Sequence, residues 1–163
     1  MLIPETLFNE PQRQYGKDDY WTPKWLFDAL GLEFDIDVAC PPEGPAHTPC
    51  KAYYTQETNG LTSDWNGLVW MNPPFSKPEP WVRKWLEHGD GVAILPNSNG
   101  RWWYDLWHDE RTACINVRPS NMQIISFHTP QGKMLQIPTN TLVWAIGAKS
   151  IKALHKSKLG RVR

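Results

Sequence analysis

Short apolar runs alternate with helical patterns along this chain, and few folds accommodate that order. Residues 67–71, 91–96 and 113–117 are apolar runs bounded by turn residues, as in strands that are buried on both faces. Residues 80–88 and 101–109 separate these runs and repeat apolar side chains at helical spacing. Strands that alternate with helices predict an α/β fold, with a mostly parallel sheet and helices on both faces.

Further elements extend this pattern towards both ends of the chain. A helix is expected over residues 22–31, with Thr22 as its cap and a glycine at its end. A strand is expected over residues 32–39, where apolar and polar side chains alternate. The strand-like residues 124–127 and 141–146 are separated by a glycine-containing connection, which predicts an antiparallel element near the C-terminus.

One domain is the expected organisation, because 163 residues supply one sizeable core and are too few for two domains of ordinary size. We expect an arm at residues 1–19, the domain at 20–148 and a basic tail at 149–163. The start of the chain lacks the basic segment and the apolar core of a secretory signal. No apolar run approaches the roughly 20 residues that cross a bilayer.

The three cysteines of the chain indicate a reducing compartment, because an odd number this small cannot form a disulfide framework. Cys40, His47 and Cys50 are close in sequence, but they include no CxxC pair and have no convincing fourth ligand. We therefore expect free thiols, no metal site and a cytoplasmic protein.

The formal net charge of zero conceals an uneven distribution of charge. Residues 1–110 hold 8 Lys and Arg against 17 Asp and Glu, whereas residues 111–163 hold 9 basic residues and no acid. A basic region of this kind predicts a face for an anionic polymer, with a solvated tail as the alternative. Lys149, Lys152 and Lys156 are three and four residues apart, so a helix would place them on one side.

Asn72-Pro73-Pro74-Phe75 follows the apolar run at 67–71, and ligands bind beyond the carboxyl ends of strands in open parallel sheets. The prolines restrict the backbone, so the Asn72 side chain and the Pro73 carbonyl are held in a rigid turn. Two such acceptors can bind both hydrogens of an exocyclic amine such as adenine N6 and favour its nucleophilic geometry. Phe75 offers a face on which a base can stack. The alternative is an ordinary turn at the end of a strand.

Other motifs in the first half of the chain occur in a fixed order with this tetrapeptide. They are Tyr20-Trp21-Thr22-Pro23, Phe34-Asp35-Ile36-Asp37-Val38-Ala39, Tyr54-Thr55 with Asn59-Gly60-Leu61, Asp64-Trp65, and Val69-Trp70-Met71-Asn72-Pro73-Pro74-Phe75-Ser76. In order and spacing, over about residues 20–90, the chain resembles the phage-type DNA N6-adenine methyltransferases. The resemblance implies a Rossmann-like methyltransferase fold, S-adenosylmethionine as methyl donor, and a flipped-out adenine in DNA as acceptor.

The resemblance also implies a role for individual residues. Asn72 and Pro73 would bind the target amine, and Asp64 would bind the amino group of the donor's adenine. The expected catalytic residues are Asn72, Pro73, Pro74 and Phe75. The expected donor-binding residues are Trp21, Thr22, Pro23, Asp35, Asp37, Ala39, Asp64 and Trp65. The expected DNA contacts are Ser76, Lys77, Arg101, Lys149, Lys152 and Lys156.

Two alternatives to DNA methylation stay open at the level of sequence. The same tetrapeptide would serve methylation of an RNA adenine or of a protein glutamine, although the basic C-terminal third favours nucleic acid. A catalytically silent nucleic-acid-binding protein of the same fold is the other alternative, and the intact tetrapeptide speaks against it. The chain lacks a Gly-rich loop after the strand at 32–39, which leaves open how the donor's carboxylate is held.

Overall fold

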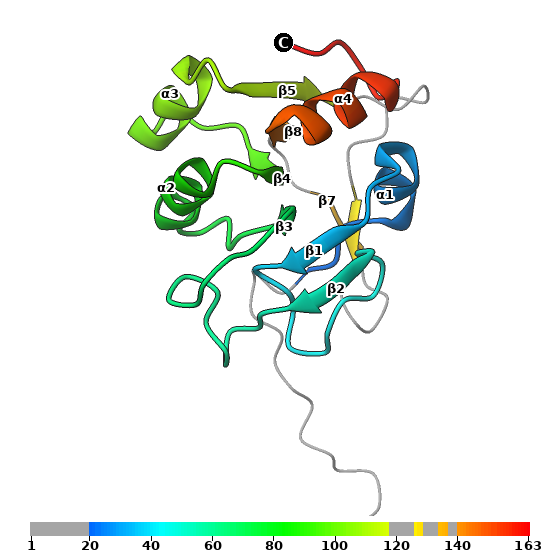
Figure 1. Ribbon diagram of the computed structural model, residues 1–163, viewed down its shortest axis with the longest axis vertical. Helices are drawn as coiled ribbons and strands as arrows, with labels where there is room; N and C mark the ends of the chain where they lie inside the picture. Colours follow the sequence, from blue (N-terminus) through cyan, green and yellow to red (C-terminus); the bar gives the residue numbers. More distant parts are fainter. Residues whose placement is uncertain (1–19, 118–125, 129–133, 137–139) are drawn as a thin grey trace, which may run out of the picture.

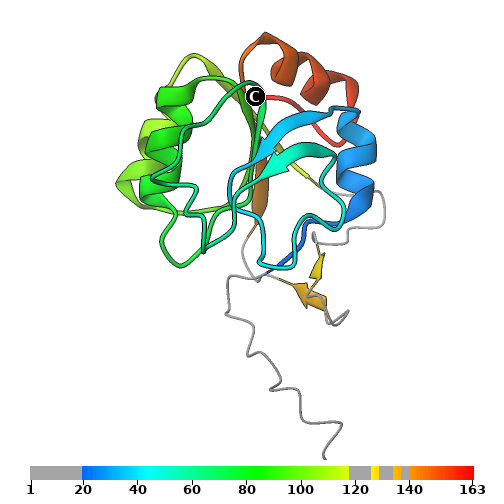
Figure 2. The same cartoon turned by 60° about the horizontal axis from the view of Figure 1, so that its bottom comes forward.

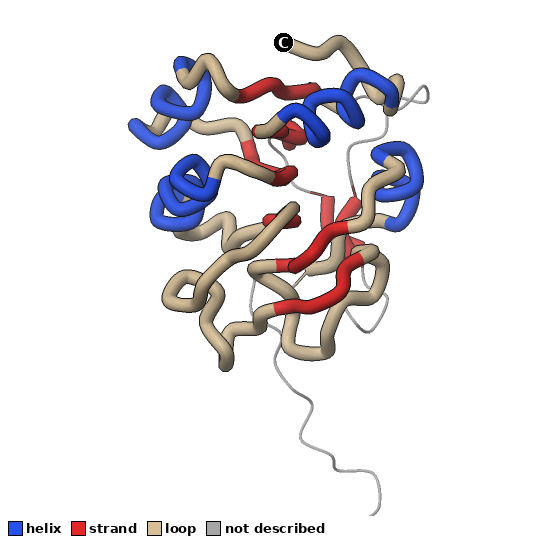
Figure 3. The backbone as a smooth tube through the Cα atoms, viewed as in Figure 1, coloured by secondary structure: helices blue, strands red, loops and turns tan. Residues whose placement is uncertain are grey.

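The computed structural model describes residues 20–117, 126–128, 134–136 and 140–163. These residues form helices α1 (Lys24–Leu30), α2 (Glu79–His88), α3 (Arg101–His108) and α4 (Ala148–Lys156), shown in Figure 1. They also form strands β1 (Phe34–Asp37), β2 (Cys50–Tyr53), β3 (Val69–Met71), β4 (Gly91–Pro96), β5 (Thr112–Asn116), β6 (Ser126–His128), β7 (Met134–Gln136) and β8 (Thr141–Ile146), shown in red in Figure 3. None of the described helices combines the length and apolar character that crossing a membrane requires.

Six strands form the main sheet, in the order β2-β1-β3-β4-β8-β5. Strands β1 to β4 run parallel to one another, with Ile36 opposite Val69 and Met71 opposite Ala93. Strand β8 runs antiparallel to both β4 and β5. The prediction of a mostly parallel sheet with an antiparallel element near the C-terminus is therefore confirmed.

Two pairs of helices cover the two faces of the sheet, with α2 and α3 on one face and α1 and α4 on the other (Figure 1). Strand β4 contributes to both sides because successive side chains point to opposite faces. Val92 and Ile94 pack with side chains of α1 and α4, while Ala93 and Leu95 pack with those of α2 and α3. Burial on both faces explains why this strand is a continuous apolar run in the sequence.

The structure differs from the sequence prediction at the start of α1 and at β2. Pro23 occupies the N-cap of α1, so the prediction of Thr22 as the cap is wrong. The Thr22 hydroxyl instead accepts a hydrogen bond from Asn72. Gly31 ends the helix as expected, with a left-handed φ of 61° that glycine adopts easily. The sequence did not predict strand β2, because β2 is a mostly exposed edge strand without an apolar run.

The segment expected as a basic tail, residues 149–163, is part of the folded domain. Helix α4 buries Ala153 and Leu154 and packs against β8, β5 and α1. Beyond α4 the chain returns along β5, where the Arg163 N–H donates to the Cys114 carbonyl at 2.9 Å. The buried side chains of α4 hold this helix against the sheet. The arm expected at residues 1–19 lies outside the described residues.

Strands β1, β3, β4 and β5 end at the same edge of the main sheet, which we call the carboxyl edge. Asn72 follows β3 at this edge, and Asn97 follows β4. The hairpin of β6 and β7, outside the main sheet in Figure 2, is joined to the segment before α1 by backbone hydrogen bonds between His128 and Trp21. The carboxyl edge is where open parallel sheets bind ligands.

Candidate active site

The side-chain amide of Asn72 is held in one orientation. Its Nδ2 donates hydrogen bonds to Thr22 Oγ1 at 3.2 Å and to the Tyr20 carbonyl at 3.4 Å. Thr22 is buried, so its hydroxyl has little freedom to move. Among the described residues, no hydrogen bond reaches Asn72 Oδ1. The arrangement therefore presents Oδ1 as a fixed acceptor, the polarity that a substrate amine requires.

A pocket of about 320 Å³ lies beside Asn72 at the carboxyl edge. Its volume falls within the roughly 300–1,000 Å³ that is typical of small-molecule sites. The wall combines residues that follow β1, β2 and β3 with one residue of α2. The lining residues are Ala39, Cys40, Pro41, Thr55, Gln56, Asn59, Gly60, Asn72, Pro74 and Trp81. Sequence reasoning quoted Thr55, Asn59 and Gly60 as matching motifs but assigned them no role, and it missed Gln56 and Trp81.

Lys84, a residue of α2, holds one wall of this pocket in place. Its Nζ donates to the Leu61 carbonyl at 2.8 Å, to the Gly60 carbonyl at 3.1 Å and to the Ser63 carbonyl. The ammonium also lies 4.8 Å from the ring centroid of Trp65, a cation–π contact. Partial burial holds the pKa of Lys84 below its usual value. Lys84 is thus a positioning residue for the loop that follows β2.

Asp64 and Trp65, two expected donor-binding residues, lie in the same loop but do not line the pocket. Trp65 is buried, and its Nε1 donates to the Gly60 carbonyl at 2.7 Å. Asp64 is exposed, and its backbone carbonyl accepts a hydrogen bond from the Tyr54 hydroxyl at 2.8 Å. The indole therefore shapes the wall through Gly60, whereas the Asp64 carboxylate stands at the outer end of the loop.

Asp37 is a buried carboxyl group at the end of β1, with only 3% of the residue exposed. The Ala39 N–H donates to its Oδ1 at 3.2 Å, and the Thr48 hydroxyl donates to its Oδ2 at 3.1 Å. Burial outweighs these two hydrogen bonds and raises the pKa of Asp37 to about 7. A group two residues from the pocket wall can therefore change its charge near neutral pH.

Asp35, by contrast, lies away from this site. Its carboxylate accepts a hydrogen bond from the Leu68 N–H at 2.8 Å and pairs with Lys51 at 2.9 Å. These two hydrogen bonds hold the pKa of Asp35 below its usual value. Leu68 precedes β3, so the contacts lie at the amino ends of the strands, opposite Asn72. Residues two apart in a strand share a face but differ in their distance from its ends, so Asp35 lies farther from the pocket than Asp37. That Asp35 binds the donor stays a prediction.

The remainder of the tetrapeptide forms the turn after β3. Pro73 is buried and Pro74 lines the pocket. Phe75 is half-buried, and its ring meets Phe127 edge-on, with the centroids 5.8 Å apart and the planes at 84°. The Lys77 N–H donates to the Pro74 carbonyl at 3.2 Å, which closes the turn. Phe75 is therefore held at the carboxyl edge by the hairpin of β6 and β7.

The expected DNA contacts fall into two groups that the structure does not bring together. Ser76, Lys77 and Arg101 are exposed at the carboxyl edge, just after β3 and at the start of α3. Lys149, Lys152 and Lys156 are exposed on α4. Helix α4 begins at the opposite edge, because Gly147 contacts Asp90, which precedes β4. The first group thus lies nearer to Asn72 than Lys149 does.

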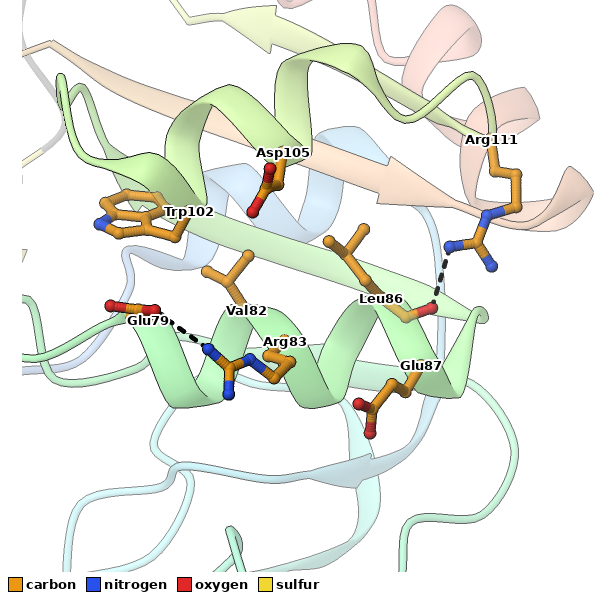
Figure 4. A pocket seen from close by; sticks show the side chains of 8 residues that line it. All are labelled: Glu79, Val82, Arg83, Leu86, Glu87, Trp102, Asp105 and Arg111. Carbon is orange, nitrogen blue, oxygen red and sulfur yellow. Dashed lines mark hydrogen bonds and ion pairs between the residues drawn. The ribbon is translucent and has the colours of Figure 1, made fainter.

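A further hollow of about 270 Å³ lies between α2 and α3 (Figure 4). Most of its charged side chains have partners within the chain. Arg83 pairs with Glu79 at 3.1 Å, and Arg111 Nη2 donates to the Leu86 carbonyl at 3.2 Å (dashed lines in Figure 4). The Arg83–Glu79 pair lies within α2, whereas Arg111 joins the segment after α3 to α2. Neither contact offers an argument for a ligand.

Comparison with known proteins agrees with the site. The model of the family "DNA N-6-adenine-methyltransferase (Dam)" matches residues 11–144. A DNA N-6-adenine-methyltransferase of Haemophilus phage HP1 (strain HP1c1) is 32% identical over 127 residues, which cover 72% of this chain and 72% of that protein. A second one, of Escherichia phage T1, is 36% identical over 78 residues, which cover 44% of this chain and 32% of that protein. No solved structure matches. The family that the motifs indicated is confirmed, and the chain belongs to the DNA N-6-adenine-methyltransferase (Dam) family.

Proposed function

We propose that this enzyme transfers a methyl group from S-adenosylmethionine, held in the pocket beside Asn72, to N6 of an adenine flipped out of DNA. The observation that carries the proposal is the fixed amide of Asn72, whose Oδ1 faces no partner among the described residues. Within a duplex the amine cannot reach a donor in this pocket, so the base must leave the stack at a cost of a few kcal/mol.

Asn72 Oδ1 and the Pro73 carbonyl would accept the two hydrogens of N6 and draw its lone pair towards the methyl group. When bound, S-adenosylmethionine supplies an electrophilic methyl carbon whose bond to sulfur breaks as the bond to N6 forms, leaving S-adenosylhomocysteine. The N6 proton is then lost to solvent, so no side chain need act as a base. Phe75, braced by Phe127, would stack on the flipped adenine.

On the donor side, the segment before α1 has two proposed functions. Thr22 acts through Asn72, because its hydroxyl holds the amide. Trp21 and Pro23 border the amino-acid end of the donor, and Trp21 Nε1 donates to the Gly44 carbonyl at 3.0 Å, which ties the segment to the loop after β1. Asp64 would accept a hydrogen bond from the adenine amine of the donor, beside the loop that Lys84 holds.

We expect the affinity for S-adenosylmethionine to rise with pH up to about 7. The folded pKa of Asp37 is raised, so the free enzyme carries a neutral carboxyl below that pH. A sulfonium or ammonium group of the bound donor near Asp37 favours the charged carboxylate. Below the pKa that Asp37 has in the free enzyme, binding of the donor must then release the proton of Asp37. The affinity should increase by about 20-fold between pH 5.5 and 7.5, as measured by calorimetry. The matched variant Asp37→Asn should bind with a flat pH profile, and a wild-type profile that is equally flat would contradict the prediction.

Replacing Lys77 and Arg101 with alanine together is expected to flatten the salt dependence of DNA binding. Both lie at the carboxyl edge, and each phosphate contact in duplex DNA contributes about −0.9 to the slope of log K against log salt. Binding should weaken for all sequences alike, as measured by anisotropy at several salt concentrations. A matched double variant, Lys149→Ala with Lys152→Ala, should change the slope less. The reverse result would move the DNA-binding face to α4.

The direct test of the function is methyl transfer with a radiolabelled donor and three acceptors: plasmid DNA, RNA and protein. The expected product is N6-methyladenine in DNA. Label that appears only in RNA or in protein would favour the corresponding alternative substrate. The absence of label in all three, despite donor binding by calorimetry, would overturn the proposed function.

A further inference from the structure

A pocket of about 510 Å³ lies at the carboxyl edge but outside the site described above. It lies over the ends of β4 and β5 and the start of β8, and α3 forms one wall. We call it the aromatic–amide pocket, after the two kinds of side chain that dominate its lining. None of the described residues that line it carries a charge. A phosphate or a charged peptide would therefore find no counter-charge inside it, whereas a neutral planar group would fit.

Three aromatic side chains of α3 line this pocket: Trp103, Tyr104 and Trp107. Trp103 and Trp107 are one turn apart and both meet the buried Trp144 edge-on, with centroids 5.4 and 6.0 Å away, while Tyr104 is next to Trp103 and points farther outward. Tyr104 is 58% exposed and Trp107 is 52% exposed, the two largest values among the large hydrophobic residues of the described chain. Packing alone would favour burying such rings, so their exposure indicates a surface that binds a flat partner.

The lining of the pocket also includes four asparagines: Asn97, Asn99, Asn116 and Asn140. All four are exposed, and among the described residues none makes a hydrogen bond through its side chain. An asparagine amide offers a donor and an acceptor in one plane, which matches the edge of a nucleobase. Recognition of an unstacked base requires aromatic rings on which it stacks and polar groups that hydrogen-bond to its edge, and this pocket has both.

The position of this pocket relative to Asn72 fits a strand that passes both. Strands β3 and β4 are neighbours, Met71 pairs with Ala93, and the Asn97 N–H donates to the Asn140 carbonyl at 2.7 Å beyond the end of β4. Asn97 follows the strand next to the one that delivers Asn72, and it lies three residues farther along than Ile94, the residue opposite Asn72, which is about 10 Å. Both pockets also border helices of the same sheet face, α2 through Trp81 and α3.

We propose that the aromatic–amide pocket binds a second, unstacked base of the DNA strand that carries the target adenine. The base stacks against Tyr104 and Trp107, and the asparagine amides contact its edge. The inference rests on the proposed function, since it takes the bound polymer to be the methylation substrate. The methyltransferase domain itself would then contact a base near its target.

The test is equilibrium binding of a labelled single-stranded 13-mer, made of thymines with one central adenine, followed by anisotropy. Trp107→Ala combined with Tyr104→Ala should raise the Kd by about 5- to 150-fold, the range expected for one lost base–aromatic stack. Trp107→Phe should retain most of the affinity. The matched control is Trp25→Ala, which removes a ring that is 39% exposed on α1, on the other sheet face, and should leave the Kd unchanged.

A second measurement places the base. Abasic sites are introduced one at a time at the three positions on each side of the adenine. In the wild type, an abasic site at one of these positions should weaken binding more than an abasic site at any other. In the double variant, an abasic site at that position should not weaken binding further. The proposal is overturned if the wild type does not bind the strand, if the double variant binds like the wild type, or if the abasic sites act equally in both. Methylation of plasmid DNA by the wild type reports separately on the proposed function.

Discussion

Replacement of Asn72 by alanine is expected to lower kcat for methyl transfer by about 10²- to 10³-fold, as for loss of one precisely placed polar group in other active sites. The substitution removes the fixed Oδ1 acceptor, so one hydrogen of the target amine loses its partner. The affinity for S-adenosylmethionine should change little, because Asn72 is one of the ten residues that line the pocket. Product formation at saturating donor, measured beside calorimetric binding of the donor, separates the two effects.

Two further variants make this prediction specific. Asn72→Asp keeps an acceptor but loses the Nδ2 donor to Thr22 and Tyr20, so its kcat should lie between those of the wild type and Asn72→Ala. Thr22→Val removes the hydrogen bond between the Thr22 hydroxyl and Asn72 Nδ2 but leaves Asn72 Oδ1 in place. The loss of this one hydrogen bond is expected to lower kcat by about 10-fold. Wild-type turnover in Asn72→Ala would remove Asn72 from the mechanism.

Gly60→Ala is expected to weaken S-adenosylmethionine binding by about 10-fold or more and to lower Tm by about 3–10 °C, the effect of forcing an extra methyl group into a packed site. A Cβ at Gly60 would lie 1.9 Å from the Val38 carbonyl oxygen and 3.2 Å from the Trp81 ring. The backbone oxygen cannot rotate away, so the loop after β2 must separate from the end of β1. That displacement would open the pocket wall and move the carbonyl that Trp65 and Lys84 bind.

Gly31→Ala is the matched control for this steric effect. No atom lies within 4 Å of a Cβ at Gly31, and only its left-handed φ of 61° opposes the substitution. It should cost about 1 kcal/mol of stability and leave donor binding unchanged. Thermal unfolding and calorimetry on both variants distinguish the cases. Equal loss of donor binding in the two variants would mean that general instability, and not the close approach at Gly60, is responsible.

The central strands and the target-binding turn were the parts most accessible from sequence. Strand β4 is buried on both faces, so its apolar run identifies it directly. Asn72 was assigned from the residues around it, because the two prolines that follow restrict the backbone whatever the tertiary context. The hydrogen bonds that orient its amide come from Tyr20 and Thr22, about 50 residues earlier, and no local pattern encodes such a contact.

The walls of the donor pocket were less accessible for the same reason. Asp35 and Asp37 are equivalent in the alternating pattern of their strand, and only the register with β3 sends one towards Leu68 and the other to the carboxyl edge. Lys84 belongs to α2, and no pattern in the sequence around it predicts its contacts. Its three carbonyl partners lie more than 20 residues away, so its role follows from tertiary structure alone.

The place of β8 in the sheet limits the order in which this protein can fold during synthesis. Strand β8 (Thr141–Ile146) lies between β4 and β5, although both of these strands leave the ribosome before it. A nascent chain that ends before Thr141 therefore has two sheet strands with no partner between them, and each presents unpaired backbone groups. Closure of the sheet must wait until β8 emerges and inserts. Until β8 has emerged, the unpaired edges of β4 and β5 expose the nascent chain to aggregation.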